Sequence, residues 1–145
     1  MRIGGGTDPD PGPRVTLVEP PRWRFGEHML EVRQRGADTE LGQISFRNLD
    51  RRRSRAELGI ELYPAHRGRG YGTEAIRLLL RMLFDEYGLK TVYLRVREHN
   101  LVARRVYEKV GFRYVKTIRW PLVGIVRYLM MEIEADDFTW RPGPR

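Results

Sequence analysis

One strand–helix–strand unit constrains the fold of this chain more than any other feature. Its strands are expected over residues 56–64 and 91–97, where apolar and polar side chains alternate. Between them, apolar residues recur with the period of an α-helix and predict a helix over residues 73–87. This apolar stripe consists of Ile76, Leu79, Leu80, Leu83 and Tyr87. We therefore expect two parallel strands joined by a right-handed crossover.

The remaining segments predict strands that pair mostly in an antiparallel way around this unit. Asn100 begins a second helix over residues 101–110, and Gly111 ends it. Further strands are expected over residues 14–20, 28–36, 40–50, 112–120 and 124–134. The expected fold class is α/β (α+β): a mixed, mostly antiparallel twisted sheet with a central parallel βαβ unit and helices packed on it.

Length and composition indicate one globular domain. The chain has 145 residues, of which 41% are hydrophobic and 32% charged. We expect the domain over residues 15–138, between a flexible arm (residues 1–14) and an unstructured tail (residues 139–145). The sequence contains no cysteine and only three separated histidines, which argues against a disulfide framework and against a metal site. No apolar run has the length of a membrane span and no signal peptide is recognisable, so a cytoplasmic protein without membrane contact is expected.

The formal net charge of +8 suggests an anionic partner, and a nucleic acid is the first candidate. The alternative is that arginine is simply abundant along the whole chain, as in residues 48–57, and the basic residues are not concentrated in one helix. Charge alone therefore does not identify the partner.

A glycine-rich turn lies between the strand 56–64 and the helix that follows it. Gly68, Gly70 and Gly72 would let the backbone approach a ligand closely, and the first amides of a helix attract phosphate. Thr73 and Glu74 occupy positions that suit a helix cap and a dipole-matched acid. The spacing does not match a dinucleotide-binding fingerprint, and no Gly-Lys-Ser/Thr of a Walker loop occurs. A purely structural turn and a phosphate site both remain open from the glycines alone.

Two motifs that follow one another in the sequence favour the phosphate site, because together they resemble a known family. Arg67-x-x-Gly70-x-Gly72 is followed by "NLVARRVYEKVGF" (residues 100–112), and together they resemble the GCN5-related N-acetyltransferase family, which transfers an acetyl group from acetyl-CoA to an amine. The resemblance extends from about Glu40 to about Glu134. It implies the acyl-CoA N-acyltransferase fold, acetyl-CoA as co-substrate and no metal. Within the family, the chain is most similar to the branch of ribosomal-protein N-terminal, spermidine and aminoglycoside acetyltransferases.

The resemblance also implies roles for individual residues. Asn100 would contact the pantetheine or phosphate region, and Tyr107 would be the general acid that protonates the departing thiolate. The strand before the turn would place Leu62, Tyr63 and Pro64 beside the pantetheine arm. Backbone amides of the turn would bind the diphosphate of CoA, and these belong to Arg67, Gly68, Arg69, Gly70, Tyr71, Gly72 and Thr73.

The spacing of residues is compatible with these roles. Asn100, Arg104 and Tyr107 lie on one face of the second helix and could line a cofactor groove. A strand amide such as that of Leu62 could donate to the oxygen of the tetrahedral intermediate. Positive charge for the CoA phosphates could come from Arg67, Arg69, Arg104 and Arg105.

The amine must lose a proton before it attacks a thioester, so a base is required. Glu57 and Glu61 lie on one face of the strand before the turn, and Glu57 is preferred because an acid at the matching position serves as base in some family members. His99, next to the second helix, is a further candidate.

The part that precedes the first hairpin differs from the family. Members usually begin with a strand and one or two helices that build the acceptor pocket, whereas about 25 residues precede the hairpin here, and "PPRWRF" (residues 20–25) is a poor helix. We expect a shortened acceptor wall, or one completed by the partner subunit of a homodimer. The acceptor would be a primary amine of a small molecule or of a peptide. The alternatives are a CoA-binding sensor or scaffold with little turnover and, less favoured, a basic nucleic-acid-binding module.

Overall fold

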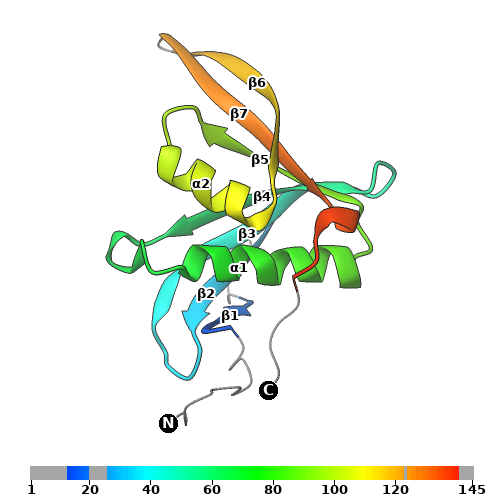
Figure 1. Ribbon diagram of the computed structural model, residues 1–145. Helices are drawn as coiled ribbons and strands as arrows, with labels where there is room; N and C mark the ends of the chain where they lie inside the picture. Colours follow the sequence, from blue (N-terminus) through cyan, green and yellow to red (C-terminus); the bar gives the residue numbers. More distant parts are fainter. Residues whose placement is uncertain (1–12, 20–25, 123, 141–145) are drawn as a thin grey trace, which may run out of the picture.

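A computed structural model describes residues 13–19, 26–122 and 124–140 (Figure 1). Its centre is a seven-stranded sheet with the order β1-β2-β3-β4-β5-β7-β6. The strands are β1 (Val15–Val18), β2 (Glu27–Gln34), β3 (Glu40–Asp50), β4 (Arg55–Leu62), β5 (Thr91–Arg97), β6 (Arg113–Leu122) and β7 (Gly124–Glu134). The helices are α1 (Tyr71–Arg81), which a π-helical segment (Met82–Glu86) continues, and α2 (Leu101–Val110). Two short 3-10 turns cover Pro64–His66 and Ala135–Asp137.

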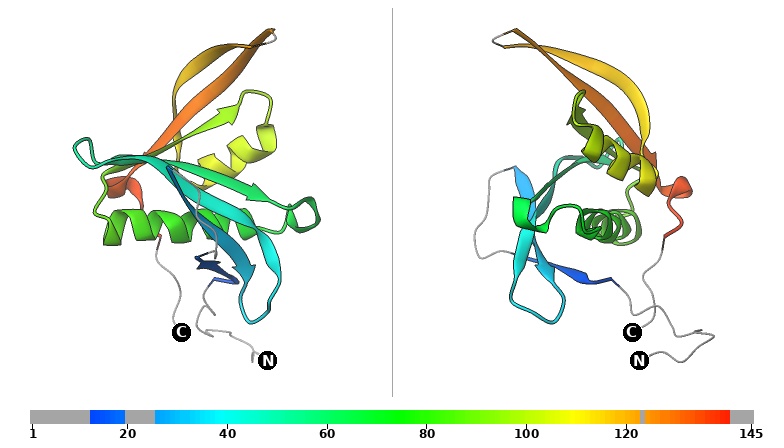
Figure 2. Two further views of the ribbon diagram at one scale, coloured as in Figure 1. Left: turned by 180° about the vertical axis from the view of Figure 1, so that it is seen from behind. Right: turned by 60° about the vertical axis from the view of Figure 1, so that its left-hand side comes forward.

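The sheet is mixed, as predicted from the sequence. Every pair of neighbouring strands is antiparallel except β4 and β5, which are parallel and flank the crossover through α1. Both helices lie side by side on one face of this twisted sheet (Figures 1 and 2). The strand–helix–strand unit therefore has the arrangement that its sequence pattern predicts.

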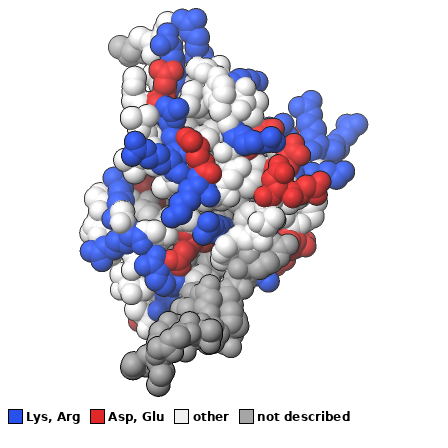
Figure 3. Space-filling view, in the orientation of Figure 1, with Lys and Arg blue, Asp and Glu red and all other residues white. Residues whose placement is uncertain are grey.

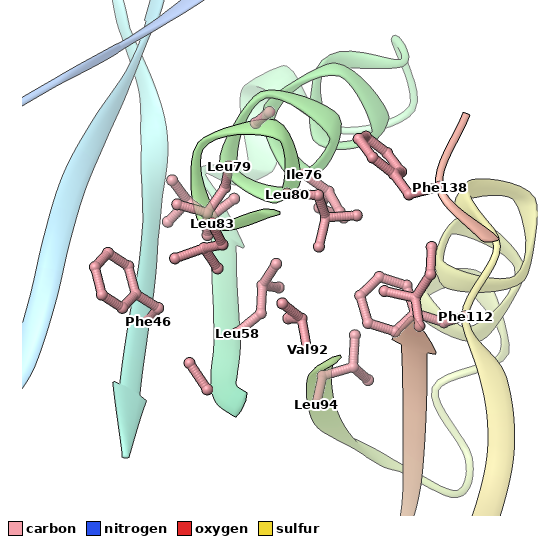
Figure 4. Close-up of a cluster of buried hydrophobic side chains, with 14 of the residues drawn as sticks. Phe46, Leu58, Ile76, Leu79, Leu80, Leu83, Val92, Leu94, Phe112 and Phe138 are labelled. Atoms are coloured by element: carbon pink, nitrogen blue, oxygen red, sulfur yellow. The ribbon is translucent and has the colours of Figure 1, made fainter. Parts of the chain in front are cut away.

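The hydrophobic core lies between the two helices and the sheet (Figure 4). Ile76, Leu79, Leu80 and Leu83 of the predicted apolar stripe are fully buried there, and Tyr87 packs against the edge of the core. From the sheet, the core receives alternate residues of the central strands, among them Ala56, Leu58, Val92, Leu94 and Val96. These strand residues define the helix-covered face, and the residues between them define the opposite face, which we call the open face.

β4 and β5 separate soon after they begin. Only three residue pairs connect them: Arg55 with Thr91, Ala56 with Val92 and Glu57 with Tyr93. β4 remains paired with β3 as far as Leu62, and β5 remains paired with β7 as far as Arg97. The two central strands therefore form a fork, visible in Figure 1, and no other strand of the described residues pairs with the facing edges.

The boundaries at the glycine turn differ from those predicted. α1 begins at Tyr71, and its N-cap is Gly70 in a left-handed conformation with φ 84°. Thr73 is therefore not the cap but a buried residue of the first turn. The cap assignment failed because a glycine with positive φ can begin a helix without a capping side chain. The predicted cap at Asn100 is confirmed, since its Oδ1 accepts a hydrogen bond from the Ala103 amide.

The predicted arm and tail lie largely outside the described residues, as does the segment 20–25. Residue Arg14, at the end of the predicted arm, is hydrogen-bonded to Glu74 of α1. Trp140, in the predicted tail, packs against the core, with its ring centroid 6.4 Å from that of Phe138. In the part of the chain that the structure describes, no helix is long and apolar enough to cross a bilayer.

Candidate active site

A groove of about 650 Å³ runs along the fork edge of β4 and past the start of both helices. The glycine turn closes one end of the groove, and α2 forms its opposite wall. Residues from four parts of the chain line it: Ile60, Glu61, Leu62, Arg67, Gly68, Gly70, Gly72, Thr73, Ile76, Asn100, Val102, Ala103, Val106 and Tyr107. The two motifs that the sequence analysis combined therefore meet in one cavity.

The glycine turn presents backbone amides to this groove. Gly68 and Gly70 have φ values of 76° and 84°, which side chains with a Cβ rarely adopt. The first intrahelical hydrogen bond of α1 joins the Glu74 amide to the Gly70 carbonyl, so the three preceding amides have no partner within the helix. Amides without an intrahelical partner and the positive end of the helix dipole are features that favour an anion at this turn.

Arg14 lies outside both sequence motifs but contacts the glycine turn. Its Nη2 donates to the Arg69 carbonyl at 2.8 Å, and its guanidinium lies 4.7 Å from the centre of the Tyr71 ring. Its backbone amide and Nε both donate to the Glu74 carboxylate at 2.5 Å. No sequence pattern predicts this contact, because Arg14 lies in a glycine- and proline-rich segment far from the turn.

Arginines surround the end of the groove that the turn forms. Arg67 lines the groove, and its Nε donates to the Leu62 carbonyl at 2.9 Å, which ties the turn to the end of β4. Arg69 is exposed beside it, as is Arg105 on α2. Figure 3 shows Lys and Arg side chains gathered on the side of the molecule that carries the turn and the start of α2. An anionic ligand is favoured at this end of the groove.

The fork edge of β4 offers hydrogen-bond donors along the groove. The Tyr63 amide donates to the Leu41 carbonyl of the preceding strand at 2.9 Å. Because amides of an antiparallel strand alternate in direction, those of Ile60 and Leu62 point away from β3, into the fork. Leu62 lines the groove. Tyr63 instead turns its hydroxyl to the Glu40 carboxylate, and Pro64 starts the short 3-10 turn, so neither side chain lines the groove.

α2 contributes Asn100 and Tyr107 to the groove, with Ala103 and Val106 between them. Arg104 was expected on the same face, but its Nη1 donates to the Glu98 carbonyl at 3.1 Å, so its guanidinium is held next to the end of β5. The difference arises because the turn before α2 presents a carbonyl that a long side chain can reach. His99 is exposed and is not among the groove-lining residues.

Tyr107 is mostly buried, and its ring packs edge-on against Phe112 at a centroid distance of 6.0 Å. Burial raises the pKa of the Tyr107 hydroxyl above its ordinary value, because the phenolate would be poorly solvated there. The group therefore remains a proton donor throughout the neutral range.

Glu57 and Glu61, the two predicted base candidates, have different surroundings. Glu61 is exposed and lines the groove. The Glu57 side chain is only 1% exposed, and its carboxylate accepts hydrogen bonds from Arg95 Nε at 2.7 Å and Asn48 Nδ2 at 2.9 Å. Arg47 Nη2 adds a third contact at 3.2 Å. Sequence reasoning missed this cluster, since its members meet only through the register of three strands.

Burial of Glu57 would by itself raise the pKa of its carboxyl, but the hydrogen bond from Arg95 and the charge of Arg47 outweigh it and lower that pKa. A carboxylate that is stabilised in this way accepts a proton poorly. Glu57 thus has the surroundings of a structural ion pair at the point where the fork opens.

Replacing Glu57 with glutamine is expected to lower the free energy of unfolding by about 2–3 kcal/mol, somewhat less than for a fully buried ion pair because both arginines are partly exposed. The folded pKa of Glu57 is lower than its unfolded value of about 4.3. The contribution of the Glu57 carboxylate to the free energy of unfolding is therefore fully present when the pH is above the unfolded pKa. It is lost as the pH falls through the folded pKa. Urea unfolding at pH 7 and at pH 3 would measure both effects; a difference between wild type and variant that did not shrink at pH 3 would contradict them.

The comparisons with known proteins agree with this geometry. A family model described as an acetyltransferase (GNAT) domain matches residues 18–113. The chain therefore belongs to the GNAT acetyltransferase family, as its two motifs suggested.

Relatives in this family include enzymes from the branch named in the sequence analysis. YjcK of Bacillus subtilis, a probable N-acetyltransferase, is 37% identical over 100 residues, which cover 68% of this chain and 55% of that protein. The ribosomal protein bS18-alanine N-acetyltransferase of Haemophilus ducreyi is 36% identical over 56 residues, covering 39% of this chain and 37% of that protein. The chain spans about half the length of the first curated relatives it matches.

Solved structures share the fold. A crystal structure of spermidine N-acetyltransferase from Vibrio cholerae in complex with CoA and spermine superimposes with a TM-score of 0.71 at 22% identity, covering 78% of this chain and 68% of that chain.

Proposed function

We propose that this protein transfers an acetyl group from acetyl-CoA to a primary amine, by direct attack of the amine on the thioester while both substrates are bound. The observation that carries the proposal is the single groove in which an anion-binding turn, a row of strand amides and a protonated tyrosine follow one another. Acetyl-CoA has the matching order of parts: a diphosphate, a pantetheine arm and a thioester.

The residues present fit this co-substrate. The amides from Gly68 to Thr73 would bind the diphosphate, whereas the Arg67 amide, also expected there, donates to the Pro64 carbonyl at 3.4 Å. The nearby arginines would approach the remaining phosphates. The fork edge of β4 would pair with the amide groups of pantetheine, which run in the direction of a strand that is missing there. Asn100 would contact the arm from the opposite wall.

Three groups would then serve the chemistry at the fork. The hydroxyl of Tyr107 would give its proton to the departing thiolate. A β4 amide, that of Ile60 or Leu62, would donate to the oxygen of the carbonyl under attack. Glu61 would take the proton of the ammonium group, directly or through water, because it lines the groove while Glu57 accepts hydrogen bonds from three residues.

The proposal is tested by binding and turnover in sequence. Acetyl-CoA at 100 times its Kd should stabilise the protein by about 2.7 kcal/mol, which a thermal shift would detect. Release of free thiol in the presence of candidate amines would then show transfer. If neither acetyl-CoA nor CoA stabilised the protein, the assignment of the groove as the acetyl-CoA site would be contradicted.

One structural feature favours a second candidate, a CoA-binding sensor with little turnover. Only residues 19–26 separate β1 from β2, a much shorter segment than one or two helices that build an acceptor pocket would need. Tight acetyl-CoA binding without acetylation of any amine would support this candidate. A homodimer in which the partner completes the acceptor wall would instead restore the enzyme. We place either activity in the cytoplasm, where acetyl-CoA would be available.

A further inference from the structure

We propose that the acceptor is an amine on a small molecule that also carries an anionic group, such as a carboxylate or a phosphate, and not a polyamine. This inference rests on the proposed acetyltransferase function and concerns the open face of the sheet, from which an acceptor can reach the fork. The chemistry of both sides of the fork carries the argument.

The two sides of the fork carry opposite charges on the open face. If the register of Glu57 with Tyr93 continued, Gly59 would lie opposite Arg95 and Glu61 opposite Arg97. The strands separate instead, and the gap between them opens onto the groove, which Glu61 lines. An acceptor that enters here meets a carboxylate on β4 and two guanidinium groups on β5.

On the β4 side of the fork, the other carboxylates of the open face that belong to β2, β3 and β4 are already engaged. Glu27 pairs with Arg47, which also contacts Glu57, and Glu31 pairs with Arg33. Glu40 accepts a hydrogen bond from the hydroxyl of Tyr63. Among the carboxylates of β2, β3 and β4, Glu61 is the one for which the structure records neither a hydrogen bond nor an ion pair. A polyamine needs several such acids in a row, whereas one ammonium group needs one.

Both arginines can accept an anion. Glu57 engages Nε and Nη2 of Arg95, so three of its five N–H groups are left for another acceptor, and its side chain is 41% exposed. Arg97 is exposed and lies 5.8 Å from the ring centre of Tyr128, which holds its guanidinium on the open face. Guanidinium groups bind carboxylate and phosphate with paired hydrogen bonds. The β5 side of the fork therefore offers the anion site that the β4 side lacks.

The width of the fork limits the length of the acceptor. Paired strands lie about 4.8 Å apart, and the two sides are farther apart where pairing has ended. An ammonium at Glu61 and an anion at Arg95 or Arg97 would thus be separated by at least this distance, which requires a chain of about three or more carbon atoms.

Four primary amines test the inference with the full chain and acetyl-CoA: γ-aminobutyrate, 3-aminopropyl phosphate, spermidine and propylamine. We expect kcat/KM to be about tenfold or more higher for at least one of the two anionic amines than for propylamine, since one charge-assisted hydrogen bond is worth at least that factor. The carboxylate and phosphate compounds distinguish the two sources of the anion. Spermidine should be no better than propylamine.

Variants of Arg97 provide the second readout, because Arg97 is outside the ion-pair cluster of Glu57. Arg97→Glu should raise KM for the anionic amine about tenfold, and it should improve kcat/KM for the two purely cationic amines, more for spermidine than for propylamine. Arg53→Glu, at the exposed turn between β3 and β4, is the matched control and should change none of these values.

A preference of the wild type for spermidine, or equal use of all four amines, would overturn this inference and leave the acetyltransferase function standing. Binding of acetyl-CoA without thiol release from any amine would overturn both.

Discussion

Replacement of Tyr107 with phenylalanine is expected to lower kcat by about 100-fold or more, with little change in the Kd for acetyl-CoA. The ring lies in the wall of the groove against Phe112, and phenylalanine preserves that packing. The variant lacks only the hydroxyl group, which is the proposed proton donor. Without it, the thiolate of CoA has to leave unprotonated, and this step becomes slower. Steady-state thiol release together with calorimetric binding of acetyl-CoA would separate the two effects.

The pH dependence of this step gives an independent measurement. Because burial raises the pKa of Tyr107, the wild type should keep its acid through the neutral range and lose activity only at strongly alkaline pH. The variant should lack that alkaline decline. Tyr114→Phe is the matched control, since the Tyr114 hydroxyl contacts Thr117 on exposed β6. Unchanged kcat in Tyr107→Phe would remove the acid role from Tyr107.

Local patterns in the sequence were sufficient to predict the order of the elements along the chain and the parallel pair at the centre of the sheet. The apolar period of residues 76–87 depends only on which side of a helix faces the core, and the alternation in residues 91–97 depends only on the two faces of a strand. Both were observed. The start of α1 was predicted two residues late, because side-chain capping preferences do not describe a helix that begins at a glycine with positive φ.

The candidate site also has one part that local patterns predict and another part that they do not. The glycine turn and the pair Asn100 and Tyr107 lie within short motifs, so their spacing alone places them on a loop and on one helix face. Arg14 could not be found in this way, because its contact with the turn depends on where β1 joins the sheet. The surroundings of Glu57 depend on the register of β3, β4 and β5, which one sequence does not specify. Long-range pairing thus decides which of two glutamates on one strand reaches the groove.

A valine at position 70 is expected to weaken acetyl-CoA binding by about 100-fold or more. A Cβ there would lie 3.0 Å from Nη2 of Arg14, and φ of 84° is strained for any residue other than glycine. The turn would have to move, and with it the amides proposed to bind the diphosphate. The loss of two charge-assisted hydrogen bonds, at about 1.5 kcal/mol or more each, corresponds to that factor in Kd.

Gly88→Val separates backbone strain from loss of the site. Gly88 also has a positive φ, 69°, but a Cβ at this position would meet no atom within 4 Å, and the residue is not part of the groove. Both variants should lose about 1–2 kcal/mol of stability from strain alone, which thermal unfolding without ligand would record. Only Gly70→Val should fail to be stabilised by acetyl-CoA. The amides of the glycine turn cannot keep their orientation when valine replaces Gly70. If both variants bound acetyl-CoA as tightly as the wild type, the diphosphate would therefore not be bound by this turn.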